Sequence, residues 1–242
     1  MKLIKVTVAL AALIGGSAFA GDKCPVVEPC TVPFTGSVSF GWESDYIFRG
    51  VKLGEQAPWA AAAINLPLAT DVSLDLGTWY LNSTKNAVNY DELDVYAFLN
   101  FPLWIFKASV GGTWYDYPEG FFADSNGEGA IKLAYDVGTL FTLTGFAAYD
   151  FVGDGWYLEL AANKTIPLTD CLDLGLGAGI SDVEHYFGLD GWNNAFARAS
   201  LIYHLTKTAS LTGYLGGDFP LDAIDATEVN RLHGGASLTV TF

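Results

Sequence analysis

Hydrophobic and polar residues alternate along most of the chain from residue 34 onward. In the C-terminal range Leu232–Phe242, the even-numbered positions are apolar or small, and the odd-numbered positions are polar or glycine. The same period of two runs through Phe34–Glu43, Tyr90–Phe101, Tyr157–Ile166 and Leu172–Ser181. Successive side chains of a β-strand point to opposite faces of a sheet, so this period predicts strands with one apolar face.

Two kinds of connection interrupt the predicted strands, and they take turns along the chain. Short connections are expected near 67–71, 101–104, 136–139, 167–170 and 204–207. Longer polar connections are expected near 50–56, 82–89, 117–127, 150–154, 181–191 and 218–231. Alternating short turns and longer loops, with about twelve strands between them, are typical of bacterial outer-membrane barrels, whose strand number is even. We therefore predict an all-β fold over residues 34–242, a transmembrane antiparallel up-and-down β-barrel of outer-membrane type.

The composition favours a membrane location for these strands. The chain is 51% hydrophobic and 14% aromatic. Only 16% of its residues are charged, against roughly 25% in an ordinary soluble domain. After the N-terminal segment, no apolar run approaches the roughly 18 to 20 residues that a membrane-spanning helix requires. A soluble β-sandwich is the alternative, because its strands also alternate, but a sandwich usually carries more surface charge.

Aromatic residues gather at both predicted ends of the strands. Next to the longer connections lie Trp42, Trp59, Trp114, Trp156 and Trp192. Next to the short turns lie Phe101, Trp104, Tyr135, Tyr203 and Phe242. Amphipathic rings prefer the headgroup level of a bilayer, so two aromatic girdles are expected.

The first twenty residues have the three parts of a secretory signal peptide. A basic n-region precedes an apolar core over residues 6–14, and residues 18–20 form an A-x-A cleavage site. We expect residues 1–20 to be removed on export. Residues 21–33 contain several prolines and are expected to form a periplasmic N-terminal tether without a core of its own.

Two cysteines lie close together in the tether. Disulfides persist in exported chains, so Cys24 and Cys30 are candidates for a local disulfide. A metal site is the alternative, but two thiols without a nearby histidine or a second pair fall short of a tetrahedral ligand set. Cys171 is left over, as a free thiol or an exchange partner. We expect no metal and no cofactor.

The charge balance argues against a nucleic-acid partner. The chain carries 12 Lys and Arg against 27 Asp and Glu, a formal net charge of −15, and has no basic stripe for a phosphate backbone. Acidic residues of the predicted outer loops are Asp182, Glu184, Asp190, Asp218, Asp222, Asp225 and Glu228. A solvated rim is expected there, and divalent cations that bridge it to lipopolysaccharide are the alternative.

Strand alternation also predicts which charges line the lumen. The acidic candidates are Glu43, Asp75, Glu92, Asp94, Glu159 and Asp173. The basic candidates are Lys107, Lys132, Lys164 and Arg198. A narrow passage with an excess of negative charge concentrates cations. The alternative is that these charges pair across the lumen and close it.

A ten-residue motif, GWESDYIFRG, continues the first predicted strand over residues 41–50. If the alternation continues, Tyr46 and Phe48 face lipid, whereas Asp45 and Arg49 face the lumen near the outer mouth. There the two charges would pair with each other or with opposite strands. A structural ion pair that shapes the first loop is favoured over a ligand site.

Two resemblances follow from these residues. The segment SDYIFRG is similar to the SDYxFRG opening of the TorF-type porins, a bacterial family otherwise known as conserved proteins of unknown function. The resemblance implies an outer-membrane barrel with porin activity and supplies no catalytic residues. The final LTVTF resembles the last strand of outer-membrane proteins, which implies that the barrel-assembly machinery recognises Phe242.

Catalytic chemistry finds little support in the sequence. An outer-membrane lipid-modifying enzyme would need a serine and a histidine within hydrogen-bond reach, oriented by an acidic or amide group. His233 on the lumen parity of the last strand and Ser125 in a polar loop are the candidates. We found no phosphate-binding glycine loop or metal-binding H-E-x-x-H motif.

We therefore predict a passive channel for small polar or cationic solutes in the outer membrane of a Gram-negative bacterium. Its expected partners are outer-membrane lipid and lipopolysaccharide, the barrel-assembly machinery and the solutes themselves. A non-conducting structural or adhesion barrel is the first alternative. A membrane enzyme is the second.

The terminal aromatic gives a first test. Deleting Phe242 is expected to leave exported protein misassembled in the periplasm, because the recognition end is lost. Heat-modifiable gel mobility and outer-membrane levels measure assembly. Normal values for both in the deletion strain would contradict the assigned role of Phe242.

Overall fold

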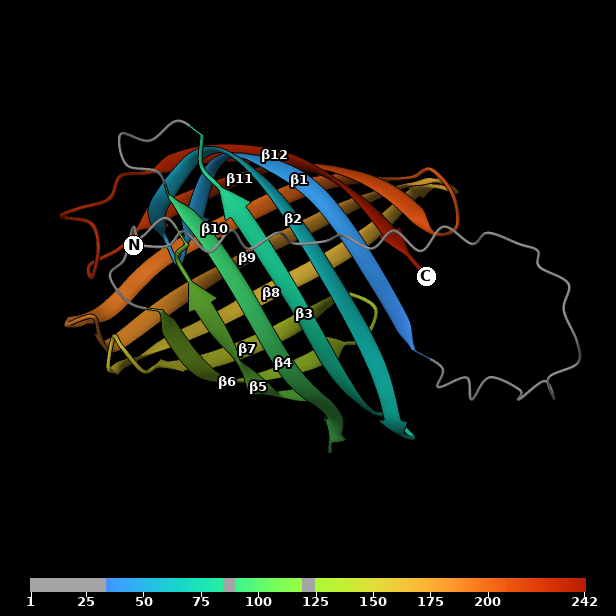
Figure 1. The fold of residues 1–242 in the computed structure, drawn as a ribbon, viewed down its shortest axis with the longest axis horizontal. Coiled ribbons are helices and arrows are strands. Elements are labelled where there is room, and N and C mark those ends of the chain that lie inside the picture. The colour runs from blue at the N-terminus through green and yellow to red at the C-terminus, as the bar shows by residue number, and fades with distance from the viewer. Residues whose placement is uncertain (1–33, 85–89, 119–124) are drawn as a thin grey trace, which may run out of the picture. The chain divides into compact units, whose positions relative to one another are not determined.

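The computed structural model describes residues 34–84, 90–118 and 125–242. These residues form twelve antiparallel strands that close into a barrel (Figure 1). The strands are β1 Thr35–Phe48, β2 Val51–Ala69, β3 Val72–Asn82, β4 Asp91–Leu103, β5 Phe106–Asp116, β6 Asn126–Val137, β7 Phe141–Asp150, β8 Gly155–Thr169, β9 Leu172–Tyr186, β10 Leu189–His204, β11 Ala209–Pro220 and β12 Arg231–Thr241. The predicted fold class and strand number are confirmed.

Pairing between the first and last strands closes the barrel. Each strand pairs with its neighbours in sequence, and β1 pairs antiparallel with β12 from Ser37↔Thr241 to Glu43↔Gly235. Backbone hydrogen bonds of 2.9 and 3.0 Å join Gly36 and Phe242 beyond this register. Closure leaves no strand edge unpaired, which is the condition for a sheet to exist in lipid.

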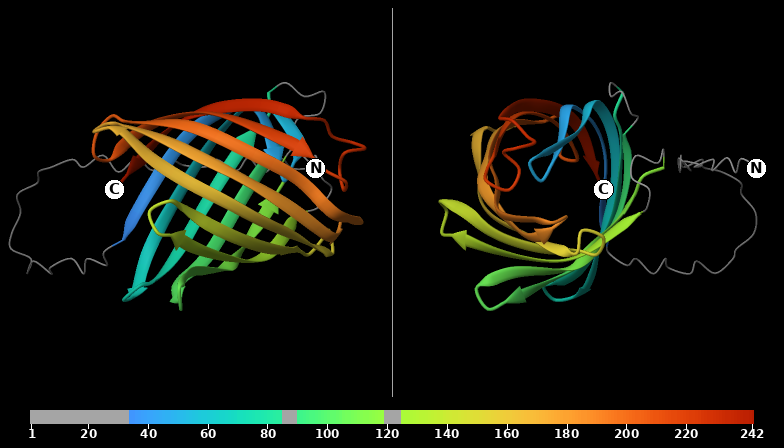
Figure 2. Two further views of the ribbon diagram at one scale, coloured as in Figure 1. Left: turned by 180° about the vertical axis from the view of Figure 1, so that it is seen from behind. Right: turned by 90° about the vertical axis from the view of Figure 1, so that its left-hand side faces the viewer.

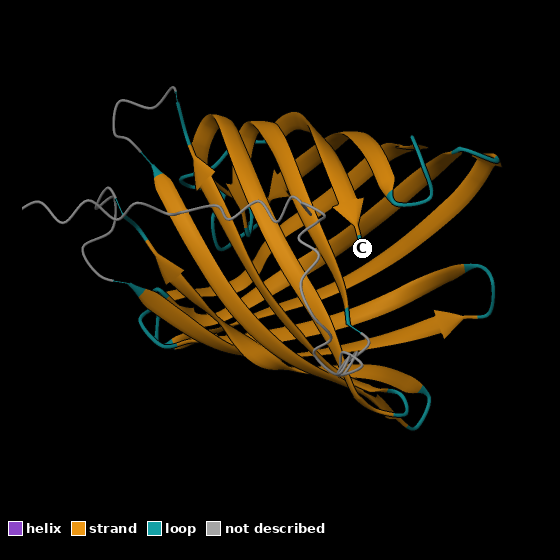
Figure 3. Cartoon of the chain, turned by 45° about the vertical axis from the view of Figure 1, so that its right-hand side comes forward, coloured by secondary structure: helices purple, strands orange, loops and turns teal. Residues whose placement is uncertain are grey.

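The two ends of the barrel differ in their connections. The end that holds the start of β1 and the end of β12 carries short connections at 70–71, 104–105, 138–140, 170–171 and 205–208, and we call it the turn end. The other, the loop end, carries connections at 49–50, 83–90, 117–125, 151–154, 187–188 and 221–230. All described residues from 35 to 241 lie in strands or in the connections between them (Figure 3). Within these residues, no helix is long and apolar enough to cross a membrane.

Two of the predicted longer connections are wrong. The expected loops over 50–56 and 181–191 are two-residue turns at Arg49–Gly50 and Phe187–Gly188. All four residues have positive φ, between 50° and 82°. Such turns match the right-handed twist of the flanking strands. The polar residues on either side, which were predicted as loop, therefore belong to the paired strands.

The outer surface is apolar and the inner surface is polar, as the alternation predicts. On β12 the outward Leu232 is 78% exposed, whereas the inward Thr239 shares a side-chain hydrogen bond of 2.9 Å with Ser39 of β1. Four of the five loop-end tryptophans are exposed. Trp59 is the exception, because its Nε1 donates to Glu43 inside the barrel at 2.9 Å. Its predicted place in the lipid girdle is wrong.

The signal peptide, the tether and the cysteine pair Cys24 and Cys30 lie outside the described residues. Cys171 lies in the turn between β8 and β9 as a partly exposed free thiol.

Candidate functional site

The hairpin of β1 and β2 bends into the lumen at the loop end. Figure 2 shows its blue tip inside the ring of strands when the barrel is seen from that end. The order of the closed sheet places β7 opposite β1. The residues that the tip contacts belong to β6, β8, β9 and β10, on the far wall. The hairpin therefore spans the lumen.

Arg49, at the tip, holds the hairpin to the far wall. Its Nη2 lies 2.6 Å from Oε2 of Glu128, and its Nη1 donates to the hydroxyl of Tyr186 at 2.9 Å. Asn193 donates to the Arg49 carbonyl at 2.8 Å. We call these four residues the Arg49 latch. The side chains of Arg49 and Glu128 are 9% and 3% exposed, so this ion pair is almost dry.

Aromatic rings surround the guanidinium of the latch. Its carbon lies 4.4 Å from the ring centre of Tyr157 and 4.8 Å from that of Phe48. Gly50 completes the tip with a φ of 82°, and a Cβ there would lie 2.9 Å from Asn194 and Ile224. A cation among ring faces, with one carboxylate partner, is stabilised electrostatically in a low-dielectric site.

The pairing of Arg49 answers one question that the motif left open. Arg49 pairs across the lumen rather than with Asp45. Asp45 instead lies 2.7 Å from Nζ of Lys52 in the same hairpin, and Lys52 also contacts Glu55.

The predicted lipid exposure of Tyr46 and Phe48 is wrong. The Tyr46 hydroxyl donates to Glu92 at 2.9 Å, and the Phe48 ring lies against Tyr115 inside the barrel. The physical reason is the inward bend of the hairpin, which places both of its faces inside the barrel. Ile47 and Phe48 are adjacent in sequence, yet they line two different cavities there. A register shift with β2 between Tyr46 and Ile47 accompanies the bend.

A packed cluster fills the loop end beneath the hairpin. Tyr90, Leu81 and Ala57 are fully buried, and Tyr46 packs against them. The Tyr90 hydroxyl donates to Glu92. Burial, reinforced by the nearby carboxylate of Glu92, raises the pKa of Tyr90, so this phenol remains a donor at neutral pH.

Glu92 and Asp94 therefore lie inside the barrel as predicted, but within packed structure. Glu92 is buried, and one carboxylate oxygen of Asp94 is buried without a hydrogen-bond partner among the described residues. Among the other acids, Glu43 accepts from Trp59 and Tyr214, and Asp75 accepts from two asparagines.

The charged residues near the turn end are more open. Asp173 lies 2.9 Å from His204, and Lys107 lies 2.8 Å from Asp136 in a largely exposed pair. Lys132 lies in register with Ser109 on β5 and makes no ion pair within the described part of the chain.

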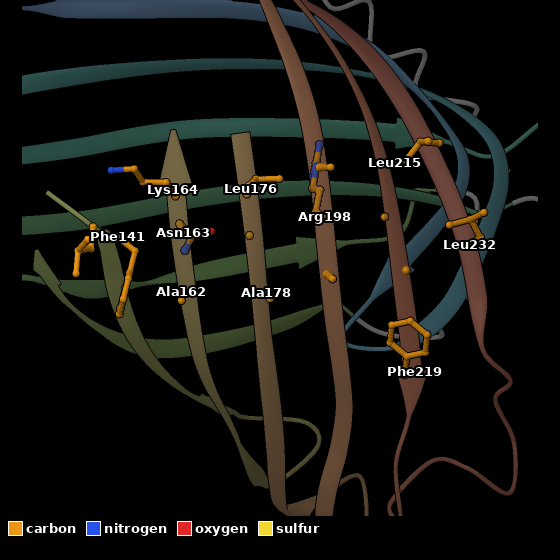
Figure 4. A pocket seen from close by; sticks show the side chains of 16 residues that line it. Phe141, Ala162, Asn163, Lys164, Leu176, Ala178, Arg198, Leu215, Phe219 and Leu232 are labelled. Atoms are coloured by element: carbon orange, nitrogen blue, oxygen red, sulfur yellow. The ribbon is translucent and has the colours of Figure 1, made fainter. Parts of the chain in front are cut away.

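The placement of Lys164 in the lumen is wrong. Lys164 has the parity of Leu158 and Leu160, lies in register with outward Leu176, and donates to the carbonyl of Thr139 in the β6–β7 turn. A long amphipathic side chain on the lipid face extends its amine toward the interface in this way. Lys164 lies at the edge of a shallow outer groove of about 650 Å³ (Figure 4). Small residues Ala162, Ala178, Ala197 and Gly217 lie in register across its floor.

Sequence reasoning missed several interior groups. Glu128 was not among the predicted lumen residues, although it has the parity of Lys132 on the same strand. That parity was the available signal. Asp150 and Asp218 were assigned to loops, yet both are buried at strand ends, where they accept from Asn126 and Asn194.

The two catalytic candidates have separate partners. Ser125 donates to Asp116 at 2.9 Å, and Nε2 of His233 lies 3.0 Å from Asp218. Within the described residues, no hydrogen bond joins Ser125 to a histidine.

Two cavities flank the hairpin. The one on the loop-end side has a volume of about 460 Å³ and is mainly aromatic and apolar, with Phe48, Tyr115 and Tyr186 in its walls. The other lies within the lumen and has a volume of about 410 Å³. Ile47, Arg49 and Gly50 contribute the hairpin side of this second cavity, which we call the lumen cavity. Strands β8 to β12 form its wall.

One family model matches most of the chain. Residues 28–219 match the profile of a family described as a bacterial protein of unknown function, Gcw_chp. This agrees with the kind of family that the SDYxFRG motif indicated, and the TorF-type name stays a prediction. Comparison with curated protein sequences finds no match.

Several solved structures have the same fold. The KdgM porin is 10% identical with a TM-score of 0.55, over 85% of this chain and 99% of that one. The NanC porin is 11% identical with a TM-score of 0.53, over 85% and 98%. An outer membrane channel from Pseudomonas putida F1 is 13% identical with a TM-score of 0.52, over 86% and 95%. At these identities the likeness shows the fold alone.

The latch predicts an asymmetric effect on stability. Glu128→Gln is expected to lower the free energy of unfolding by about 3–5 kcal/mol, because the buried guanidinium loses its counter-charge. The double variant Arg49→Gln with Glu128→Gln should recover most of this loss. Urea titration of the refolded barrel measures both. Lys107→Gln, which breaks an exposed ion pair, is the control and should cost about 0–1 kcal/mol. A Glu128→Gln barrel as stable as the control would show that the pair is not buried in solution.

Proposed function

We propose a channel function for this chain, which belongs to the bacterial Gcw_chp family of unknown function. In this proposal the barrel is a diffusion channel for small polar or cationic solutes. The β1–β2 hairpin is its gate. The observation that carries the proposal is the inward hairpin. Below it, the lumen contains a cavity of about 410 Å³, whereas the hairpin tip is fixed to the far wall. A barrel with a purely structural role needs no such cavity.

The charges of the interior support a preference for cations. Acidic side chains outnumber basic ones among the interior residues, and the acids include Glu43, Asp75, Glu159 and Asp173. A small excess of one sign in a low-dielectric passage raises the local concentration of counter-ions. The structural likeness to porins agrees with this role through the fold.

The lipid-modifying alternative receives no support from the geometry. Hydrolysis by the expected mechanism needs a serine that can transfer its proton to a histidine. Ser125 and His233 are each bonded to a different aspartate. We retain the non-conducting barrel as the outcome that the following experiments would favour if no current is seen.

The first experiment measures the gate. Single-channel conductance in a planar bilayer is expected to be higher for Arg49→Gln with Glu128→Gln than for the wild type, because the tip loses its attachment without leaving a buried charge. Lys207→Gln, in the exposed β10–β11 turn, is the control and should conduct as the wild type does. Equal conductance of the double variant and the wild type would contradict the gate. No conductance for any variant would contradict the channel.

The second experiment measures selectivity. The wild-type reversal potential in a salt gradient is expected to indicate cation preference, and Asp75→Asn with Glu159→Gln should reduce it, because both carboxylates lie inside the barrel. Asp71→Asn, in the exposed β2–β3 turn, is the matched control. An anion-selective wild type, or a preference that the interior variant leaves unchanged, would show that these carboxylates do not set permeation.

A further inference from the structure

The lumen cavity has a regular wall. Because of the strand register, five inward positions lie side by side across β8 to β12: Asn163, Gly177, Arg198, Gly216 and His233. Arg198 thus stands between two glycines. A Cβ at Gly177 would lie 2.8 Å from the Asn163 amide oxygen, and one at Gly216 would lie 2.7 Å from the His233 ring. The Asn163 amide and the His233 ring therefore occupy the space above the two glycines, on either side of Arg198.

Arg198 presents that guanidinium in a fixed orientation. Its central carbon lies 3.4 Å from the ring centre of Tyr214, so one face of the group is stacked. The Tyr214 hydroxyl in turn donates to Glu43, which holds the ring. Stacking occupies one face of a guanidinium and leaves the N–H groups along its edge available as donors. Two of these N–H groups can donate in parallel to the two oxygens of a carboxylate.

No hydrogen bond or ion pair among the described residues uses that edge. Among the described residues, no carboxylate lies within 4.0 Å of Arg198, and the side chain is exposed to the cavity. Arg198 differs in this respect from Arg49, which has its own glutamate. Ser200 and Asn163 line the same cavity and offer further donors.

A carboxylate without a direct ion pair faces the same cavity. Glu159 of β8 accepts from the Tyr157 hydroxyl at 2.8 Å, and within the described residues no Lys, Arg or His lies within 4.0 Å of it. Asp218, also in the wall, is already bonded to Asn194 and His233. The nearest opposite charges that act on these groups, Glu43 on Arg198 and Arg49 on Glu159, make no direct ion pair with them. The cavity therefore presents one charge of each sign without a direct ion-pair partner, from β8 and from β10.

We propose that the lumen cavity is a binding site for zwitterionic solutes, in which Arg198 binds a carboxylate and Glu159 faces an ammonium group. This inference rests on the proposed channel function, and it names a substrate class for that channel. A simple anion would meet the acidic interior, and a simple amine would meet the unpaired guanidinium. A ligand that carries both charges gives each group a direct partner, whereas a ligand with one charge pairs with only one of them.

Matched probes test the proposal directly. The mature chain is refolded in detergent, and binding is measured by titration calorimetry with a protein-free blank. The zwitterions are 4-aminobutanoate and 6-aminohexanoate, and their monopolar counterparts are butanoate, hexanoate, butylamine and hexylamine. At least one zwitterion is expected to bind about tenfold more tightly than both of its counterparts, because it makes a second charge-assisted contact.

Variants assign the two ends of the ligand. Arg198→Gln and Glu159→Gln should each lower zwitterion affinity about tenfold or more. Arg198→Lys should fall between the wild type and Arg198→Gln, because it keeps the charge but loses the planar edge. Lys132→Gln, another interior cation, is the control and should leave affinity unchanged. Heat-modifiable mobility confirms that each variant is folded.

Failure of this proposal differs from failure of the channel. Equal affinity for zwitterions and monopolar probes, no saturable binding, or full affinity in Arg198→Gln would overturn the site, whatever the conductance. Zwitterion binding that Arg198→Gln removes would support the site even in a barrel that conducts no current. In a barrel that conducts, the bound zwitterion should also reduce the single-channel current of the wild type and not that of Arg198→Gln.

Discussion

Backbone hydrogen bonding is the constraint on which this structure depends. A peptide group in hydrocarbon has no water to bond to, so every strand must have a neighbour on each side. The pairing of β1 with β12 meets that condition, and it sets the interior apart from the lipid. The distribution of polar side chains in the barrel follows from this separation. One face of each strand is left for lipid, and the other is free to carry charge.

Within that interior, the hairpin tip loses its hydrogen bonds to water and gains hydrogen bonds and an ion pair with the far wall. An inward-bent tip removes its side chains from water, and the removed guanidinium needs a partner of opposite charge. Glu128 supplies it at 2.6 Å, with Tyr186 and the surrounding rings in support. A buried ion pair of this kind stabilises the fold little more than an apolar contact would. Removing only one of its two partners is costly, because the other charge is left buried without a counter-charge. It is therefore suited to selecting one position of the hairpin over others.

Alternation predicted the barrel well, because burial in a two-faced sheet depends only on parity. Glu43, Asp75, Glu92 and Arg198 all make contacts on the inward faces of their strands. The prediction from alternation failed at two places. Tyr46 and Phe48 lie on a hairpin that bends inward, so both of its faces meet interior groups whatever their parity. Lys164 was assigned to the lumen against its own parity. The turn at Arg49–Gly50 read as a loop because its flanking residues are polar. The cross-lumen pairing of Arg49 could not be predicted, because contacts between opposite walls depend on closure rather than on any local pattern.

The latch also says something about the order in which the molecule is made. Arg49 is 79 positions from Glu128, 137 from Tyr186 and 144 from Asn193 along the chain. Closing such long separations before the intervening strands are in place would cost conformational entropy with nothing to offset it. We therefore expect the hairpin tip to dock only after the far wall is built. Docking of the tip requires the residues that it contacts on β6 to β10 to be in place. A docked hairpin therefore indicates a barrel in which these strands are already paired in register.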